Sequence, residues 1–381
     1  MRKMVLASIG CACISSIVCV KAEAQSVTLY GILDTGIEYI NHANSSGASV
    51  VREPINTGTV PSRWGVTGKE PLGGDWKAIF TLENGFDVGT GSLKQGGRLF
   101  GRQAFVGIDG PYGTLTFGRQ YSMILQELTQ FSLIGPDIYG FASLDPWYPN
   151  ARSDNTVAYR KDFGSVSAGF TYSFGRDNSP TGGFNTPGEG TCAGGIPGNY
   201  SACREWSAML SYTGDPWGIG IGYDSQYGGP GSAVNMFNGL APLPFTSNSN
   251  RNNRLLTDAY FKTGALRVSA FWELRHVEPQ TSSGAAITSN QWTLEAVYQL
   301  TPAFSVEGMV QRIVNSQQDT RANMAMANVT YLLSKRTALY TNLAFLKNSR
   351  KAAYSISLGG TNTPGAGMSQ LGAMIGIRHS F

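Results

Sequence analysis

The 381-residue sequence has few charged side chains, and after its first 24 residues it has no long apolar run. Charged residues make up 14% of the chain, against about 25% in an average soluble protein. The formal net charge is +4 and no Lys/Arg cluster is present, which argues against nucleic acid as a partner. No later stretch approaches the ~18 uninterrupted apolar residues of a helical membrane span.

The sequence also lacks the residue patterns of enzymes and metal sites. Its three histidines are His42, His276 and His379, and they are far apart along the chain. It has no Gly-x-Ser-x-Gly elbow, no His-Glu-x-x-His motif and no clustered Cys/His ligand set, which are the usual signatures of hydrolases and zinc enzymes. We therefore expect no enzymatic activity, no cofactor and no metal.

The N-terminus has the features of an export signal. Two basic residues precede a mostly apolar stretch over 4–20, and Ala22-Glu23-Ala24 fits an A-x-A cleavage site. Residues 1–24 are therefore predicted to be a cleaved signal peptide, with 25–381 as one mature domain. A transmembrane helix is the alternative, which the shortness of the apolar run disfavours.

Cysteine is scarce, and three of the five cysteines lie within the predicted signal. Cys192 and Cys203 would remain, close together in a Gly- and Pro-rich stretch of an exported chain. This setting favours a disulfide in an oxidising compartment. Two unpaired thiols are the alternative.

Period-two alternation of apolar with polar or glycine residues recurs along the mature chain. In residues 217–224, Trp, Ile, Ile and Tyr alternate with three glycines and Asp224. The same pattern covers segments 27–39, 76–83, 165–174, 206–212 and 266–275. Lipid on one face and water on the other produce such strands, and they must close into a barrel because lipid offers backbone polar groups no partner.

Short turns and long loops alternate between these strands. The seven predicted turns are 71–74, 110–113, 162–164, 214–216, 263–264, 300–302 and 334–336. The eight predicted loops are approximately 41–61, 85–97, 120–155, 175–205, 226–253, 277–289, 315–320 and 347–370. With both termini on the side of the short turns, the sequence predicts an all-β, 16-stranded antiparallel transmembrane β-barrel with short periplasmic turns and long extracellular loops.

Several segments, in an order that spans the mature chain, resemble the general trimeric porins of Gram-negative bacteria, in their β-proteobacterial branch. They are SVTLYG at 26–31, SRWGVTG at 62–68, KAIFTLE at 77–83, RQAFVG at 102–107, YGTLTFGRQ at 112–120, YLLSKRT at 331–337 and GIRHSF at 376–381. The resemblance implies an outer-membrane channel through which small hydrophilic solutes and ions diffuse passively. The alternatives are a substrate-specific channel, an outer-membrane enzyme, a plugged adhesin barrel and a soluble β-sandwich.

The resemblance also implies that the third long loop, 120–155, folds inward and narrows the pore. The predicted acids of this constriction are Glu127, Asp137 and Asp145. They would face basic wall residues across the pore and set up a transverse field; the alternative is that they are solvated loop acids.

The predicted basic wall consists of Arg63, Lys69, Arg102 and Arg160. Arg63, Lys69 and Arg160 share the polar face of their strands, whereas Arg102 has apolar neighbours at its own parity and is included through the resemblance. Removing the signal, with Arg2, Lys3 and Lys21 against Glu23, lowers the net charge from +4 to +2. Together these charges predict a weak preference for anions.

The last strand alternates up to a terminal aromatic residue, Phe381. In the family such an end resembles the signal that the barrel assembly machinery reads. The resemblance further implies a homotrimer joined through the first and last strands, where Gly31, Gly36, Ala373 and Gly376 are candidates for close approach between subunits. Outer-membrane lipid and lipopolysaccharide would surround it.

Overall fold

The computed structural model describes residues 26–54, 58–177, 191–279, 285–358 and 362–381. The predicted signal peptide, 1–24, lies outside the described residues. Within them, no helix is long and apolar enough to cross a membrane.

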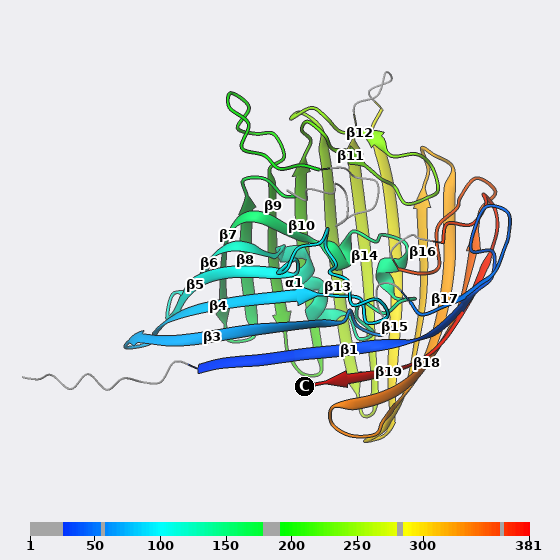
Figure 1. Ribbon diagram of the computed structural model, residues 1–381, viewed down its shortest axis with the longest axis horizontal. Coiled ribbons are helices and arrows are strands. Elements are labelled where there is room, and N and C mark those ends of the chain that lie inside the picture. Colours follow the sequence, from blue (N-terminus) through cyan, green and yellow to red (C-terminus); the bar gives the residue numbers. More distant parts are fainter. Residues whose placement is uncertain (1–25, 55–57, 178–190, 280–284, 359–361) are drawn as a thin grey trace, which may run out of the picture.

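Sixteen antiparallel strands form a closed barrel (Figure 1). They are β1 (Ser26–Ile40), β3 (Arg63–Gly73), β4 (Trp76–Gly85), β5 (Gln103–Gly110), β6 (Gly113–Tyr121), β7 (Arg152–Phe163), β8 (Val166–Ser173), β9 (Glu205–Thr213), β10 (Trp217–Tyr227), β13 (Arg251–Thr263), β14 (Leu266–Glu278), β15 (Ile287–Thr301), β16 (Phe304–Asn315), β17 (Thr320–Leu332), β18 (Thr337–Asn348) and β19 (Gln370–Ser380). Three short strands lie in loops: β2 (Val50–Arg52) pairs with β1, and β11 (Ala233–Val234) pairs with β12 (Leu243–Pro244). The predicted strand number is confirmed.

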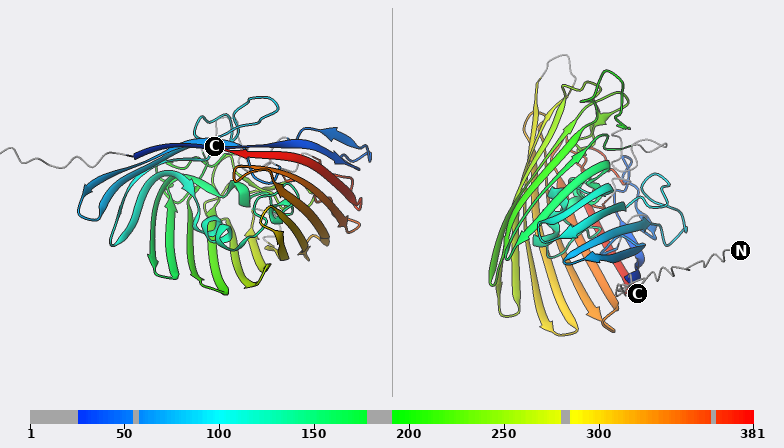
Figure 2. Two further views of the ribbon diagram at one scale, coloured as in Figure 1. Left: turned by 90° about the horizontal axis from the view of Figure 1, so that it is seen from below. Right: turned by 90° about the vertical axis from the view of Figure 1, so that its left-hand side faces the viewer.

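The barrel closes where the first strand meets the last. One part of β1 pairs with β3, from Ser26 opposite Lys69 to Ile32 opposite Arg63. The rest of β1 pairs with β19, from Ile32 opposite Ser380 to Ile40 opposite Gly372. The strands therefore form a ring, which the view along the barrel in Figure 2 shows with helical segments inside it.

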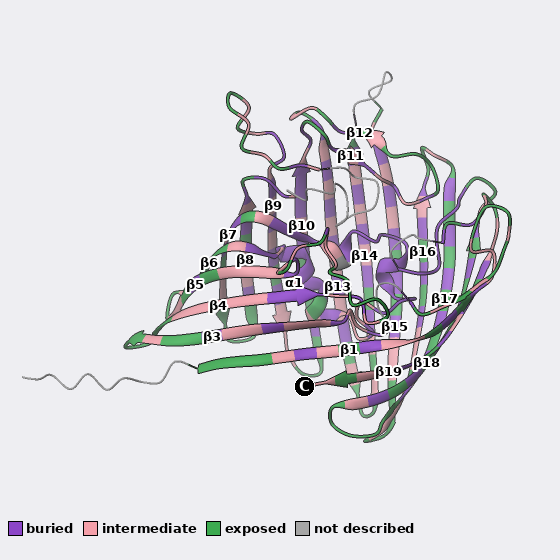
Figure 3. Ribbon diagram, viewed as in Figure 1, coloured by how far each residue is buried: buried purple, intermediate pink, exposed green. Residues whose placement is uncertain are grey.

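The two faces of the strands differ as the alternation predicts. In β18 exposed and buried residues alternate almost without exception, and in β10 exposed Trp217, Ile219 and Ile221 alternate with buried glycines. Figure 3 shows the resulting bands of exposed and buried residues along the strands. The apolar face thus points outward and the polar face points into a lumen that is partly filled by loops.

The predicted alternation of short and long connections is also present. The short turns are 74–75, 111–112, 164–165, 214–216, 264–265, 302–303 and 333–336. The connections at the other end of the barrel are 41–62, 86–102, 122–151, 174–204, 228–250, 279–286, 316–319 and 349–369. All of them are longer than the short turns except 316–319, which has four residues, as many as 333–336. Gly164 and Gly264 open two of the two-residue turns with φ of 65° and 54°, a conformation that glycine adopts without steric cost.

The third long loop, 122–151, lies inside the barrel. It contains α1 (Met123–Phe131) and two 3₁₀ turns, η1 (Phe141–Ser143) and η2 (Tyr148–Asn150). The helix packs against β8, β9, β10 and β13. Apolar side chains of the loop form a buried cluster with Leu256, Tyr260 and Phe271 of the wall. This packing places the loop against one side of the lumen and leaves the opposite side, with β3 to β6, facing it.

Candidate functional site in the barrel lumen

Buried polar contacts hold loop 122–151 against the inner wall. Asp137 accepts hydrogen bonds from the Asn342 side chain of β18 at 2.9 and 3.1 Å. The backbone N–H of Leu133 donates to Glu295 of β15 at 2.7 Å. Burial raises the pKa of Asp137 to about 7, although the Tyr139 N–H and Asn342 favour its charged form.

Asp145 anchors the far end of the loop. It forms ion pairs with Arg254 at 3.1 Å and Arg275 at 3.6 Å, on β13 and β14, and all three side chains are almost fully buried. The Arg254 guanidinium also lies 4.0 Å from the Trp147 ring centroid. Removal of either partner from such a pair would leave a buried charge, so this contact fixes the loop firmly.

Glu127 points from α1 into the wall. Its carboxyl group meets that of Asp258 on β13, above Gly220 of β10, where any side chain would overlap Glu127. Burial, together with the nearby Asp258 carboxyl group, raises the pKa of Glu127. Two carboxyl groups in contact need a shared proton, so this pair holds the helix only when one of them is protonated.

The three predicted loop acids therefore lie differently from the expectation. They were expected to face a basic wall across the pore or to be solvated, but each is buried against the wall that the loop packs on. The physical reason is that a loop inside a barrel must satisfy its buried polar groups, and wall side chains supply the partners. Asp145 does meet wall arginines, but in direct ion pairs and not across a channel.

A cluster of basic residues lies on the side of the lumen that faces the loop. Arg102 Nε is 2.7 Å from Glu83 Oε1, and Arg63 Nε is 3.7 Å from Glu83 Oε2. The Tyr121 hydroxyl accepts from Arg102 at 2.6 Å and donates to Glu83 at 3.1 Å. Tyr30 of β1 also donates to Glu83, at 2.9 Å. One carboxylate thus orients two guanidinium groups.

The Arg102 side chain points into the lumen, although the residues at even spacing after it in the sequence are apolar. It directly precedes β5, in which Val106 and Ile108 are exposed on the outer face. Because Arg102 lies outside the strand, the alternation of β5 does not extend to it, and its side chain turns inward to Glu83.

The other two predicted basic residues lie away from this cluster. Lys69 is exposed near the short-turn end of β3. Arg160 of β7 binds Asp162 and the Gln126 side chain of α1, each at 3.3 Å. Arg152, at the start of β7, is the arginine that joins the cluster, with its guanidinium 5.2 Å from the Tyr121 ring centroid. A register shift between β6 and β7 separates Arg152 from Arg160, so strand parity does not relate the two arginines.

A cavity of about 360 Å³ lies between this cluster and the loop. Its charged lining residues are Arg63, Glu83, Arg102 and Arg152, so three guanidinium groups face one carboxylate and two positive charges are in excess. Its loop side includes Leu125, Leu128 and Phe141 among others. Within the described part of the chain, the three loop acids, Lys69 and Arg160 are not among the lining residues.

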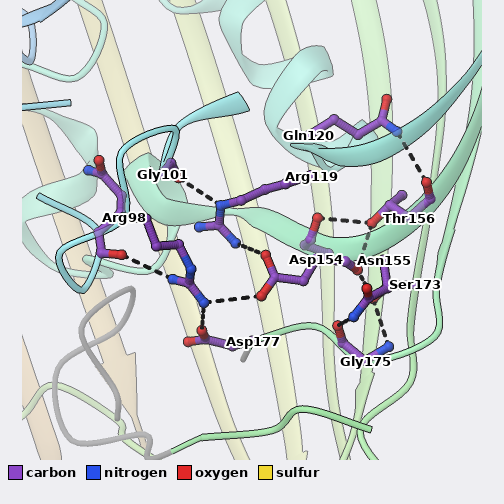
Figure 4. Close-up of polar contacts among 12 residues, drawn as sticks. Arg98, Gly101, Arg119, Gln120, Asp154, Asn155, Thr156, Ser173, Gly175 and Asp177 are labelled. Atoms are coloured by element: carbon purple, nitrogen blue, oxygen red, sulfur yellow. Dashed lines mark hydrogen bonds and ion pairs between the residues drawn. The ribbon is translucent and has the colours of Figure 1, made fainter. Parts of the chain in front are cut away.

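A second ionic network lies near the loop end of β6 and β7 (Figure 4). Arg98, from loop 86–102, binds Asp154 at 3.1 Å and Asp177 at 2.9 Å. Arg119 binds Asp154 at 2.5 Å and the Gly101 carbonyl at 2.7 Å. The network therefore fastens loop 86–102 to the wall beside the cavity.

The predicted disulfide is present. Cys192 and Cys203 are joined, with their Cα atoms 5.1 Å apart. Backbone hydrogen bonds tie Cys192 to Asp177, just after β8, and Cys203 to Gly228, just after β10. The bridge thus lies within loop 174–204, and the hydrogen bond from Cys203 to Gly228 ties this loop to the start of loop 228–250.

Phe381 lies at the seam of the barrel. Its backbone exchanges hydrogen bonds with Gly31 of β1 at 3.0 and 3.1 Å, and its ring occupies the space that a side chain at Gly31 would fill. Gly36 and Gly376 lie on the lumen face, where a side chain at Gly36 would overlap the backbone of β19 and one at Gly376 would overlap Tyr340. These two glycines are therefore needed within the subunit and do not lie on the outer face that could meet another subunit.

No group of three or more His, Cys, Asp or Glu side chains with the spacing of a metal site occurs within the described ranges. The polar groups of the lumen pair with one another and with arginines. Their arrangement suits the passage of charged solutes through a narrowed channel.

Comparison with known proteins agrees with this geometry. The chain matches the Gram-negative porin family over residues 10–351. Outer membrane porin protein 32 of Delftia acidovorans is 29% identical over 373 residues, 94% of this chain and 95% of the relative. An outer membrane porin protein of Bordetella pertussis is 26% identical over 404 residues, 88% of this chain and 94% of the relative.

Solved structures agree as well. The anion-selective porin from Comamonas acidovorans superposes with a TM-score of 0.75 at 26% identity, covering 94% of this chain and all of that one. OmpT of Vibrio cholerae, at 12% identity and a TM-score of 0.64, shares the fold. Because the family match covers most of the chain and the full-length relatives are outer-membrane porins, the chain belongs to the Gram-negative porin family and is a porin of the outer membrane.

Proposed function

We propose that the cavity between Arg63, Arg102, Arg152 and loop 122–151 is the narrowest part of the channel and that it favours anions. The supporting observation is its two excess positive charges. Charges at a constriction act strongly because little water is present to screen them. The solved relative from Comamonas acidovorans is itself described as anion-selective, which agrees with this assignment.

Reversal potentials in a salt gradient across a planar bilayer test the proposal. The wild-type channel should prefer chloride over potassium, and replacement of Arg63 or Arg152 by glutamine should shift the reversal potential toward cations. Lys69→Gln is the matched control, because it removes one positive charge outside the cavity lining and should leave the reversal potential unchanged. Cation preference of the wild type would contradict the proposal.

We propose that the loop acids Glu127, Asp137 and Asp145 act on the constriction indirectly. They hold loop 122–151 in place through Asp258, Asn342 and the arginine pair. Among the described lining residues the acid beside the arginines is Glu83. Arg160 is proposed as a further basic residue of the passage, because it binds Gln126 at the edge of the cavity.

We also propose that the subunit works as a homotrimer and reaches the membrane through an export signal over 1–24. Phe381 is proposed as the residue that the assembly machinery reads, and lipopolysaccharide as part of the lipid that surrounds the barrel. The outer face carries large apolar residues along most of its strands, which supports contact with lipid and with other subunits.

The relatives are porins, and porins are not enzymes; we propose that this chain likewise has no enzymatic activity. Assays of the refolded protein for lipase and protease activity test this directly, and turnover in either assay would contradict it.

A further inference from the structure

The cavity at the proposed constriction has two unlike sides. The barrel wall contributes Arg63, Arg102 and Arg152, whereas the loop contributes apolar Leu125, Leu128 and Phe141 together with polar Gln126, Thr129 and Ser132. The helix that carries the two leucines packs on β8, β9, β10 and β13, away from β3 and β5 where the cluster begins. A solute in the cavity therefore meets guanidinium groups on one side and, on the other, a loop surface that carries no charge and includes apolar side chains.

The apolar side exists because the loop acids point away from it. Glu127 and Asp145 are buried against the wall behind the loop. The remaining acid of the described lining, Glu83, is already bound by Arg102 and Tyr30 at 2.7 and 2.9 Å. An entering anion thus competes with the Glu83 carboxylate for the guanidinium groups of Arg63 and Arg102.

The cluster also presents a flat aromatic surface. The Tyr121 ring lies 5.9 Å from the Arg102 guanidinium and 5.2 Å from that of Arg152. A carboxylate can bind two guanidinium N–H groups at once, and a planar ring attached to it would extend toward the leucines of α1. The volume of about 360 Å³ is within the range of small-molecule sites, about 300–1,000 Å³.

We propose that this cavity is a binding site for organic anions with an apolar body, with small aromatic carboxylates bound best. The inference rests on the proposed function and deepens it, because it specifies which anions the constriction retains during passage. An inorganic anion or acetate would bind to the arginines alone. An aromatic carboxylate would also cover the apolar side chains of the loop and remove them from water.

Block of chloride current by added carboxylates tests the inference on the wild-type channel in planar bilayers. Acetate, hexanoate, cyclohexanecarboxylate and benzoate carry the same charge and differ in their apolar part. The half-blocking concentration should fall along this series, by about tenfold from acetate to benzoate. Values that differ by less than about twofold would overturn the inference.

A variant locates the effect in the cavity. Leu128→Gln keeps the arginines and makes the loop side polar, so the ratio of acetate to benzoate half-blocking concentrations should fall toward one. Leu133→Gln, on the same loop outside the cavity lining, is the matched control and should keep the wild-type ratio. If Leu128→Gln does not fold, the half-blocking concentrations of the four carboxylates on the wild-type channel still test the inference.

The two proposals fail in different ways. A cation-selective wild-type channel would overturn the proposed function, and the inference with it. An anion-selective channel that blocks equally with acetate and benzoate would overturn the inference alone. Loss of the benzoate preference in both leucine variants would place the site elsewhere and would also overturn it.

Discussion

At the seam of the barrel, the absence of a side chain at Gly31 makes room for the ring of Phe381. We predict that Gly31→Val destabilises the folded barrel by about 1–3 kcal/mol, the usual cost of overpacking. Replacement of Phe381 by alanine in the same protein should restore much of the loss, because it frees the space again. The measurement is denaturant unfolding of protein refolded in detergent.

Gly308→Val is the control for this experiment. Gly308 is also a strand glycine, on β16, but a side chain there would meet its nearest neighbour only at 3.8 Å. Equal destabilisation by the two valines would contradict the packing argument. Since refolding in detergent needs no assembly machinery, loss of assembly in cells by Phe381→Ala alone would support its separate role as a recognition signal.

Individual residues were predicted well where strand parity applies and poorly where it does not. Strand parity assigns Arg63 and Arg160 to the lumen side, whereas the register shift between β6 and β7 interrupts the alternation before Arg152. Parity does not apply to Arg102 either, because this residue precedes its strand. The partners of Glu127 and Asp145 come from β13 and β14, more than a hundred positions along the chain, and no local pattern encodes them.

Among the elements, α1 packs on the wall in a way that depends on the protonation of the carboxyl pair Glu127 and Asp258. Burial raises the pKa of Glu127 above the ordinary value of a glutamate, so the docked helix binds a proton that the undocked helix would release. Its docking is therefore fully stable below the ordinary carboxyl pKa and weakens as pH rises through the raised value. We predict that open-channel current noise rises as the pH is increased above about 5 and continues to rise toward the raised pKa of Glu127, about 11, as the loop loosens.

Glu127→Gln should remove this dependence, because the amide can donate to Asp258 without a shared proton. The noise of this variant should stay low and nearly constant with pH. Glu70→Gln, at an exposed position near the short-turn end of β3, should behave as wild type. A pH response that persists in Glu127→Gln would show that another group controls the loop.

The disulfide stabilises a loop and not the barrel. Replacement of Cys192 and Cys203 by serine should destabilise the closed segment by about 3 kcal/mol in the chain-entropy model, while the strands keep their hydrogen bonds. We predict faster tryptic cleavage at Arg204 and unchanged heat stability of the barrel. Reductant added to the wild type should reproduce the effect; no change in cleavage would mean that the loop is held by its other contacts.

Strands and turns were predictable because lipid and water act on each residue in alternation, so the pattern is local. The interior of loop 122–151 was not predictable in this way. Its α1 helix has an apolar face that packs on β10 and β13, and the sequence of the loop gives no indication of which wall strands it meets. The prediction of an inward loop came from the resemblance, while the direction of its acids had to come from the structure.

For the whole molecule, strand length points to the subunit interface. Strands β4, β5 and β6 have 10, 8 and 9 residues, whereas β13, β14 and β15 have 13, 13 and 15. A membrane-spanning strand needs about 9–11 residues, so β5 hardly spans the lipid, and β8, also with 8 residues, is as short. We expect a neighbouring subunit to cover the outer face of the short strands β4, β5 and β6, near the seam of the barrel.

We predict that Val106→Arg, on the outer face of β5, weakens the trimer, because it buries an unpaired charge at the interface. The mass of the detergent-solubilised protein, measured by light scattering, should fall toward that of a monomer. Ile219→Arg on β10, an equally exposed outer position, should leave the trimer intact. Dissociation by Ile219→Arg but not by Val106→Arg would place the interface on the other side.

The pairing of β1 with β19 joins residues more than three hundred positions apart. The part of β1 that pairs with β19 therefore cannot complete its hydrogen bonds until the end of the chain is present. An unpaired strand edge invites aggregation, so we expect the chain to be most prone to misassociation before this seam forms. Loss of the whole of β19 would leave that edge of β1 open for good.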